Sequence, residues 1–354
     1  MKELPFNQGR LTFSPATLTM VPCLPDSLEL RIKLFCLDQD GLVEAGFFDF
    51  ADLEQKRANK DVIWLHLSGT LGDDFWKHLY DFLDLTDEQM KLIRSPHRDS
   101  FFEDYHNGMF WSLARPSISD QVDAIETINF FMTSKLLITR QFSHDNAFAL
   151  VSHKLMEKGG HFANIGVDRL AATLIEDTIN SYVELLKLGG NRLEEIQNKI
   201  ILNPGKRELE LINRAQQVIW IYLNQVWPVE TVLLALQRST NPLMTEVGKQ
   251  HIAFRQDETN AVIRLFETYR AMSYNLMDVY VSGLSLRTNR TTTILTMIAT
   301  LFLPPSLIAG IYGMNFVIPE VHAPFGYYMC LALMFCVSGG LLFWLKYNGH
   351  IELQ

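Results

Sequence analysis

Cysteine and cationic residues are scarce in this chain of 354 residues. The four cysteines have no Cys-x-x-Cys spacing, so the sequence predicts neither a disulfide framework nor a thiolate metal site. Lys and Arg number 31 against 40 Asp and Glu, which gives a formal net charge of -9. A nucleic-acid partner needs a basic surface for its phosphates, so this balance argues against one.

Motifs of enzymatic chemistry are also absent. The chain contains no Gly-rich phosphate loop, no His-Glu-x-x-His and no nucleophile elbow. We therefore expect no enzymatic activity and no cofactor. The N-terminus lacks the apolar stretch of a signal peptide, because Lys2 and Glu3 are followed by Pro5.

Long uncharged runs occur only near the C-terminus, at residues 294–311 and 327–345. Each is long enough to cross about 30 Å of hydrocarbon as a helix. The alternative, a buried hairpin in a soluble core, is disfavoured because two adjacent runs of this length are uncommon in such cores. Arg287 and Arg290 precede the first run, Lys346 follows the second, and the loop between them has no Lys or Arg. The positive-inside rule then predicts a multi-pass protein of the inner (plasma) membrane with both termini in the cytoplasm.

Before these spans, the first part of the chain alternates apolar and polar residues in strand-like runs separated by helical patterns. The expected strands are residues 30–36, 62–67, 128–132 and 136–139, the last two forming a hairpin, and the expected helices include residues 73–83 and 87–93.

After residue 166, glycine and proline become sparse and apolar residues recur at helical spacing. The sequence predicts a helix over 167–201, a second over 206–238 with a kink at Pro228, and a third from Asn241-Pro242 to Tyr312. The third would be about 105 Å long. An isolated helix of that length needs partners along it, so oligomerisation is implied.

The fold class expected is an α+β membrane protein with a cytosolic α/β domain and a helical stalk that continues into the first span. The expected divisions are a cytosolic domain (1–165), a stalk (166–290), a first span (291–312), an extracytoplasmic loop (313–326), a second span (327–346) and a cytoplasmic tail (347–354).

Small and weakly polar residues share one face of the first span, where Asn289 and Gly310 lie three heptads apart. Such a face either lines a narrow passage or packs against other helices in lipid. Pro304 and Pro305 interrupt the same helix and free two carbonyl groups. We expect these prolines to lie beside a wet passage rather than to face lipid.

The first span ends in Tyr312-Gly313-Met314-Asn315, preceded by Asp278-Val279-Tyr280 and followed by Pro319-Glu320. In these motifs the chain resembles the CorA-type divalent metal ion (magnesium) transporter family, most strongly over residues 270–346. The resemblance implies a homopentamer in the lipid membrane whose first spans line a pore for divalent metal ions.

The family resemblance also implies a selectivity filter of Gly313, Met314 and Asn315. Mg²⁺ releases its waters reluctantly, and a ring of Asn315 oxygens can accept hydrogen bonds from those waters without stripping them. Gly313 is expected to turn the backbone out of the helix and Tyr312 to brace that turn. Glu320 is the acidic residue of the outer loop.

Other roles carried over from the family are a pore lining and a regulatory site. The implied pore-lining residues are Asn289, Thr292, Leu295, Ala299, Leu303, Ser306 and Gly310, with Leu295 and Leu303 as apolar constrictions. Asp278 and Asp257 are the candidate regulatory metal ligands. Glu88-Gln89 stands where the family has an acidic pair and Phe254 stands near the opposing carboxylate, so closure by cytosolic Mg²⁺ is in doubt.

Three functions remain open. The first is influx of hydrated Mg²⁺, or of Co²⁺, Ni²⁺ or Zn²⁺, down the electrochemical gradient. The second is proton-coupled zinc transport, as in a ZntB-like branch of the family. His322 in the outer loop motivates this alternative. The third is a membrane-anchored cytosolic metal sensor that conducts nothing. Two lesser features have plain interpretations: the His/carboxylate residues of 97–106 as a solvated loop rather than a metal site, and Trp220 and Trp227 as packing residues of the helical bundle.

Overall fold

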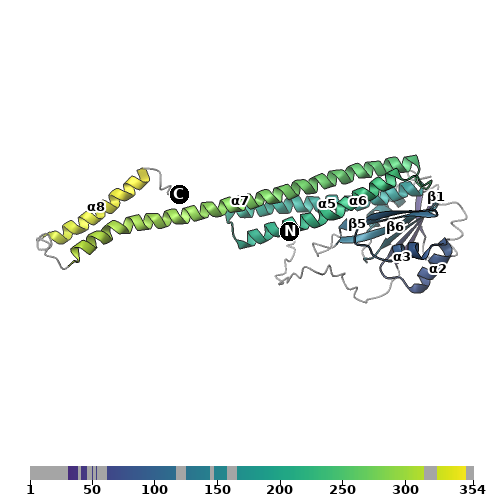
Figure 1. Cartoon of the computed structure of the whole chain (residues 1–354), viewed down its shortest axis with the longest axis horizontal. Coiled ribbons are helices and arrows are strands. Elements are labelled where there is room, and N and C mark those ends of the chain that lie inside the picture. Colours follow the sequence, from purple (N-terminus) through teal and green to yellow (C-terminus); the bar gives the residue numbers. More distant parts are fainter. Residues whose placement is uncertain are drawn as a thin grey trace.

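The molecule is elongated, with a β-sheet at one end and a single long helix that reaches the other end (Figure 1). The computed structural model describes residues 31–38, 41–45, 50, 53, 62–116, 125–143, 147–157, 166–314 and 325–347. The strands and short helices expected in the first part of the chain, and the three long helices after it, are confirmed with small changes at their ends.

A seven-stranded sheet has the order β2-β1-β3-β7-β6-β5-β4. Only the central pair β3–β7 is parallel among the neighbours described, and the predicted hairpin is β6–β7, closed by a Thr133 N–H donating to Leu136 O at 2.8 Å. The strands are β1 (Arg31–Asp38), β2 (Gly41–Ala45), β3 (Val62–Ser68), β4 (Phe101–Tyr105), β5 (Gly108–Pro116), β6 (Ile125–Met132) and β7 (Leu136–Gln141).

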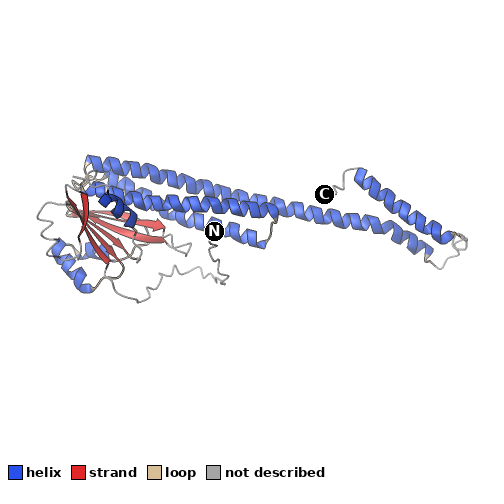
Figure 2. Cartoon of the chain, turned by 180° about the vertical axis from the view of Figure 1, so that it is seen from behind, coloured by secondary structure: helices blue, strands red, loops and turns tan. Residues whose placement is uncertain are grey.

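One face of the sheet carries α2 (Asp73–Leu83) and α3 (Asp87–Arg94), with a core of their own against it. α3 begins in a capping box, in which the Thr86 hydroxyl accepts from the Gln89 N–H and the Gln89 side chain accepts from the Thr86 N–H. The other face carries α4 (Ala149–Glu157) and the helical stalk, as the view from behind shows (Figure 2).

The stalk consists of α5 (Val167–Leu202), α6 (Lys206–Arg238) and the N-terminal half of α7 (Glu246–Tyr312), and α8 (Gly326–Tyr347) follows. α6 continues through Pro228 as one helix. α7 begins four residues later than predicted, because Asn241 forms a turn with Met244 and the Thr245 hydroxyl caps the helix by accepting from the Gly248 N–H at 3.0 Å.

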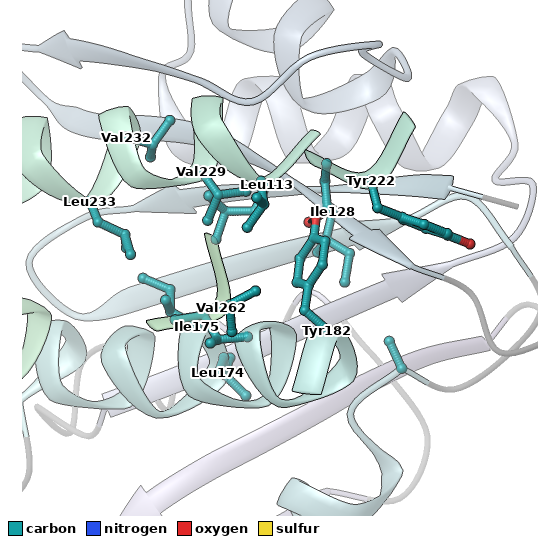
Figure 3. Close-up of a cluster of buried hydrophobic side chains, with 14 of the residues drawn as sticks. Leu113, Ile128, Leu174, Ile175, Tyr182, Tyr222, Val229, Val232, Leu233 and Val262 are labelled. Carbon is teal, nitrogen blue, oxygen red and sulfur yellow. Dashed lines mark hydrogen bonds between the residues drawn. The ribbon is translucent and has the colours of Figure 1, made fainter. Parts of the chain in front are cut away.

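The stalk and the sheet share one apolar core, in which side chains of β5, β6, α5, α6 and α7 meet (Figure 3). Tyr182 of α5 is fully buried there and its hydroxyl donates to Ala114 O at 2.8 Å. Burial raises the pKa of Tyr182, so the hydroxyl stays protonated and remains a donor. The sheet and the root of the long helix are therefore one packed unit.

Two carboxylates join the turn before α7 to the rest of the domain. Asp104 of β4 accepts from the Asn241 amide at 2.6 Å and from the Ser239 hydroxyl at 3.2 Å. Asp168, buried at the start of α5, accepts from the N–H and the hydroxyl of Thr245 at 3.0 and 2.5 Å. These contacts fix where α7 starts and hence the direction in which it leaves the domain.

The prediction that Trp220 and Trp227 pack the bundle is wrong for the single chain. Their side chains are 59% and 42% exposed on the outer face of α6. The buried residues of α6 at this level are Ile219, Tyr222, Leu223 and Val226, which occupy the face turned toward α7 and the sheet. Seven-residue spacing places both indoles on one face, but spacing alone does not say which face is buried.

Candidate ion pathway along α7

The C-terminal part of α7 is an apolar helix with few neighbours in the chain. Three described helices have the length and hydropathy of a membrane span, namely α6, α7 and α8. In the apolar 18-residue segment of α6, 39% is buried. The corresponding shares in α7 and α8 are 0% and 6%. α6 therefore buries much of its apolar surface inside the stalk. The apolar surfaces of α7 and α8, the two helices expected as membrane spans, are exposed in the described structure.

α8 covers one face of this part of α7. The side chains that are partly buried on α7 recur at three- and four-residue steps, as expected for one helical face in contact with a neighbour. They include Met297, Leu301, Pro304, Ile308 and Tyr312.

The residues predicted to line a pore lie on the opposite face of the same helix. At 100° per residue their mean direction is about 180° from that of the α8-facing residues. All seven are exposed in the chain: Asn289, Thr292, Leu295, Ala299, Leu303, Ser306 and Gly310. A side chain added at Gly310 would meet no atom within 4 Å. The structure thus gathers the predicted residues on one unpartnered face of α7.

Hydroxyl groups on this part of α7 donate hydrogen bonds to backbone carbonyls of the same helix. The hydroxyls of Thr293, Thr296 and Ser306 donate to the carbonyl four residues earlier at 2.8, 2.9 and 2.7 Å. Their oxygen lone pairs remain available to accept from water. Of these three, only Ser306 belongs to the predicted pore lining. Because residues 291–314 contain no charged side chain, that face offers only neutral groups, which suit the waters around a hydrated cation.

Pro304 and Pro305 are partly buried on the α8 side of the helix, away from the face that carries the predicted pore residues. Because proline has no N–H, the pair frees the carbonyls of Thr300 and Leu301. The Ser338 hydroxyl of α8 donates to Leu301 O at 3.4 Å, so a neighbouring span satisfies that carbonyl.

Ser338 makes a contact between α7 and α8 that sequence reasoning missed. It is the sole hydroxyl residue between residues 329 and 345, and a proline pair in the preceding span calls for a donor. Together these two observations would have predicted a hydrogen bond from Ser338 to a carbonyl freed by the prolines.

Gly313 ends α7, but not through a left-handed backbone. Its φ is -87°, a conformation open to every residue type, and its N–H donates to Ala309 O at 2.9 Å. A side chain here would approach that same carbonyl to 3.0 Å, so close packing rather than backbone freedom favours glycine. Met314 is exposed beyond it. Asn315, Glu320 and His322 lie outside the described residues.

The two candidate regulatory carboxylates do not come together within the chain. Asp257 and Asp278 are both exposed on α7 and 21 residues apart, about 32 Å along the axis. Asp278 lies eleven residues, or three turns, before Asn289 and so shares its face. Gln89 is buried and donates to Asn107 Oδ1 at 2.7 Å, while Phe254 presents an exposed ring. Neither offers a carboxylate.

No group of three or more His, Cys, Asp or Glu among the described residues could hold a metal ion. The candidate cluster of residues 97–106 is divided by its own contacts. His97 Nε2 lies 2.9 Å from Leu92 O, and Asp104 binds the turn before α7. The interpretation of these residues as a solvated loop is wrong in part, because Glu103 and Asp104 lie on β4 and His97 and Asp104 contact other parts of the domain.

Comparison with known proteins identifies the architecture. A family model described as CorA-like Mg2+ transporter protein matches residues 59–346. The cobalt/magnesium transport protein CorA of Thermotoga maritima is 24% identical over 326 residues, which cover 90% of this chain and 92% of that protein. The zinc transport protein ZntB of Pectobacterium atrosepticum is 25% identical over 227 residues, 63% of this chain and 68% of that protein.

A solved structure has the same fold. The complete structure of the CorA magnesium transporter from Methanocaldococcus jannaschii superposes with a TM-score of 0.75 at 20% identity, over 90% of this chain and 98% of that one. The expected arrangement of an N-terminal α/β domain, long helices and C-terminal apolar helices is therefore confirmed.

Proposed function

Because the chain belongs to the CorA-like Mg²⁺ transporter family, we propose that it forms a membrane channel for hydrated Mg²⁺ along α7. Five copies, the number the resemblance implies, would place their exposed α7 faces around a common axis with α8 outside. The observation that carries this proposal is the position of the predicted pore residues, which share the one face of α7 that lies away from α8.

The exposed face suits passage rather than tight binding. A ring of carboxylates would hold a divalent cation too firmly to release it, and residues 291–314 offer none. Leu295 and Leu303 would close the passage by excluding water, and Thr292, Ala299, Ser306 and Gly310 leave room between them. Asn289 and Asp278 would form polar rings at the cytoplasmic end.

Ion entry needs no chemical energy source. A membrane potential of 100 mV supplies about 4.6 kcal/mol to a divalent cation, at 2.3 kcal/mol per charge. We place the short loop outside the cytoplasm and both termini inside it, in the inner (plasma) membrane. The transported metal is cargo, and no resident cofactor is part of the proposal.

Asn315 is the proposed selectivity residue, together with Gly313 and Met314, and Glu320 is the proposed attractor at the outer mouth. The test is Mg²⁺ flux into liposomes that contain the purified protein. Asn315→Ala is expected to reduce Mg²⁺ flux or its preference over other ions. Unchanged flux and unchanged preference would remove Asn315 from the filter.

Proton-coupled zinc transport is the second candidate, because a zinc transport protein is among the relatives. Coupling requires a group that titrates within the pathway. Residues 291–314 and 325–347 contain no Asp, Glu or His, so the candidate groups are Glu320 and His322 of the outer loop and Asp278 at the cytoplasmic end. The same liposomes, loaded with and without a proton gradient, separate the two: zinc uptake that needs the gradient, without Mg²⁺ uptake, would support coupling. A folded protein that passes no ion at all would support the sensor.

Regulation through Asp257 and Asp278 stays a prediction. Since these carboxylates are about 32 Å apart on one helix, each would need ligands from a neighbouring copy to hold a metal ion.

A further inference from the structure

The turn between α5 and α6 exposes two large aliphatic side chains at its tip. Ile201 is 64% exposed and Leu202 is 85% exposed, immediately before Asn203 and the buried Pro204. Exposure of two adjacent aliphatic side chains at the end of a helical hairpin is unfavourable in water. This hairpin tip therefore calls for an apolar or interfacial environment.

The tip lies against α7 just below the first span. The Pro204 ring is 3.2 Å from where a side chain on Gly283 would begin, and Arg287 Nη1 approaches Asn203 Oδ1 at 3.4 Å. α5 and α6 end at this level while α7 continues alone (Figure 1). Arg287 lies about 10 Å along the helix before Ile294, the first apolar residue after the three threonines at 291–293.

That distance places the tip at the membrane surface. The polar headgroup layer on each side of the hydrocarbon core is about 6 Å thick. A tip about 10 Å from the hydrocarbon boundary is thus at the outer edge of the headgroups, within a Debye length of their phosphates.

Cationic residues surround the tip although the whole chain is acidic. The side chains of Lys199, Lys206 and Arg207 are exposed on the hairpin, and Arg287 and Arg290 stand beside it on α7. Against these five, the first turns of α6 carry Glu208 and Glu210, and the last turns of α5 carry Glu194 and Glu195, of which Glu195 pairs with Arg192. Basic residues close to an anionic leaflet are attracted to its phosphates.

We propose that the α5–α6 tip docks on the cytoplasmic surface of an anionic bilayer. Leu202 and Ile201 enter the headgroup layer, and the surrounding cations contact lipid phosphates. The inference rests on the proposed membrane placement of α7. Its consequence is that the stalk hairpin is tethered to the bilayer at the level where the cytoplasmic mouth of the ion pathway is proposed.

A spin label at the tip tests this on the full-length protein with its native cysteines replaced. Leu202→Cys carries the label, and Leu188→Cys is the matched control, because Leu188 is 58% exposed on the same helix about 21 Å further from the membrane. Phe335→Cys, 79% exposed on α8, reports the span itself. Each labelled protein is placed in nanodiscs of phosphatidylglycerol or of phosphatidylcholine.

The readout is collision of the label with oxygen, which concentrates in lipid, and with a water-soluble nickel complex. In anionic nanodiscs we expect nickel access at position 202 to fall several-fold relative to position 188, with a rise in oxygen access. Phosphatidylcholine, or Lys206→Gln with Arg207→Gln, is expected to reduce the difference.

Two results would overturn the docking alone while Phe335 reports lipid. One is a Leu202 label as open to nickel as the Leu188 label. The other is a Leu202 label shielded from both reagents, which would make the tip a contact with another copy of the chain. A Phe335 label open to nickel would overturn the membrane placement, and the docking with it.

Discussion

The contact between Asp168 and Gly248 permits a quantitative prediction. A Cβ on Gly248 would lie 2.1 Å from Asp168 Oδ2 and 2.7 Å from Cγ, so Gly248→Ala must displace the carboxylate. Displacement breaks two hydrogen bonds to Thr245, and hydrogen bonds to charged groups contribute about 1.5–3 kcal/mol each. Because Thr245 is exposed, water replaces part of these two hydrogen bonds. We therefore take about 3 kcal/mol as the stability lost when both are broken.

Alanine stabilises a helix by about 1 kcal/mol relative to glycine. Gly248→Ala is therefore expected to lower the free energy of unfolding by about 2 kcal/mol in total. Asp168→Ala costs about 3 kcal/mol for the same bonds. In the double variant the carboxylate is gone and the methyl group fits the vacated space, so the total is about 2 kcal/mol rather than the additive 5.

Thermal unfolding of the full-length protein, followed by tryptophan fluorescence, measures these differences. At about 2–4 °C per kcal/mol, Asp168→Ala lowers Tm by roughly 6–12 °C, and adding Gly248→Ala restores part of it. Gly189→Ala is the matched control, because its Cβ would meet Tyr269 only at 3.9 Å, and it is expected to raise Tm slightly. Additive losses in the double variant would refute the reasoning.

Three further predictions test other contacts. Ser338→Ala leaves Leu301 O without its donor and is expected to destabilise the paired spans by about 1 kcal/mol in detergent, whereas Ser338→Thr keeps the bond; equal effects would contradict it. Burial, helped by the charges of Lys33 and Arg140, lowers the pKa of His66 to about 3, so below pH 6.5 the unfolded chain takes up a proton that the folded chain does not. Stability therefore falls as pH drops, by about 1.4 kcal/mol from pH 7.5 to 5.5, and His66→Gln removes that slope in Tm; a slope shared by both proteins would be the contrary result. Asp104→Ala frees the turn before α7 and is expected to speed hydrogen exchange at residues 239–245, and unchanged exchange there would count against the anchor.

Local sequence signals predicted the helices well. Residues 73–83 and 206–238 match α2 and α6, because each segment follows a glycine and keeps its apolar residues at helical spacing. The strands buried on both sides were harder. β5 is buried along almost its whole length, and its run Met-Phe-Trp-Ser-Leu-Ala shows no alternation to identify it, so it was not predicted.

Contacts across the chain could not be predicted from spacing. The pore-lining residues were placed on one face of α7 by helical periodicity, and the structure puts α8 on the other face. Periodicity did not show that Pro304 and Pro305 face α8, nor that Trp220 faces outward, since both depend on which neighbour each helix receives. Asp168 was missed because its partner Thr245 is 77 residues away.

The central claim is that the face of α7 opposite α8 lines a water-filled passage for Mg²⁺. Cysteine accessibility tests it directly in liposomes with a cysteine-free protein. Ser306→Cys lies on the exposed face and Ile308→Cys on the α8 face. The account predicts that a charged methanethiosulfonate reagent blocks Mg²⁺ flux through the Ser306→Cys protein and leaves the Ile308→Cys protein active. Block at Ile308→Cys without block at Ser306→Cys would contradict it.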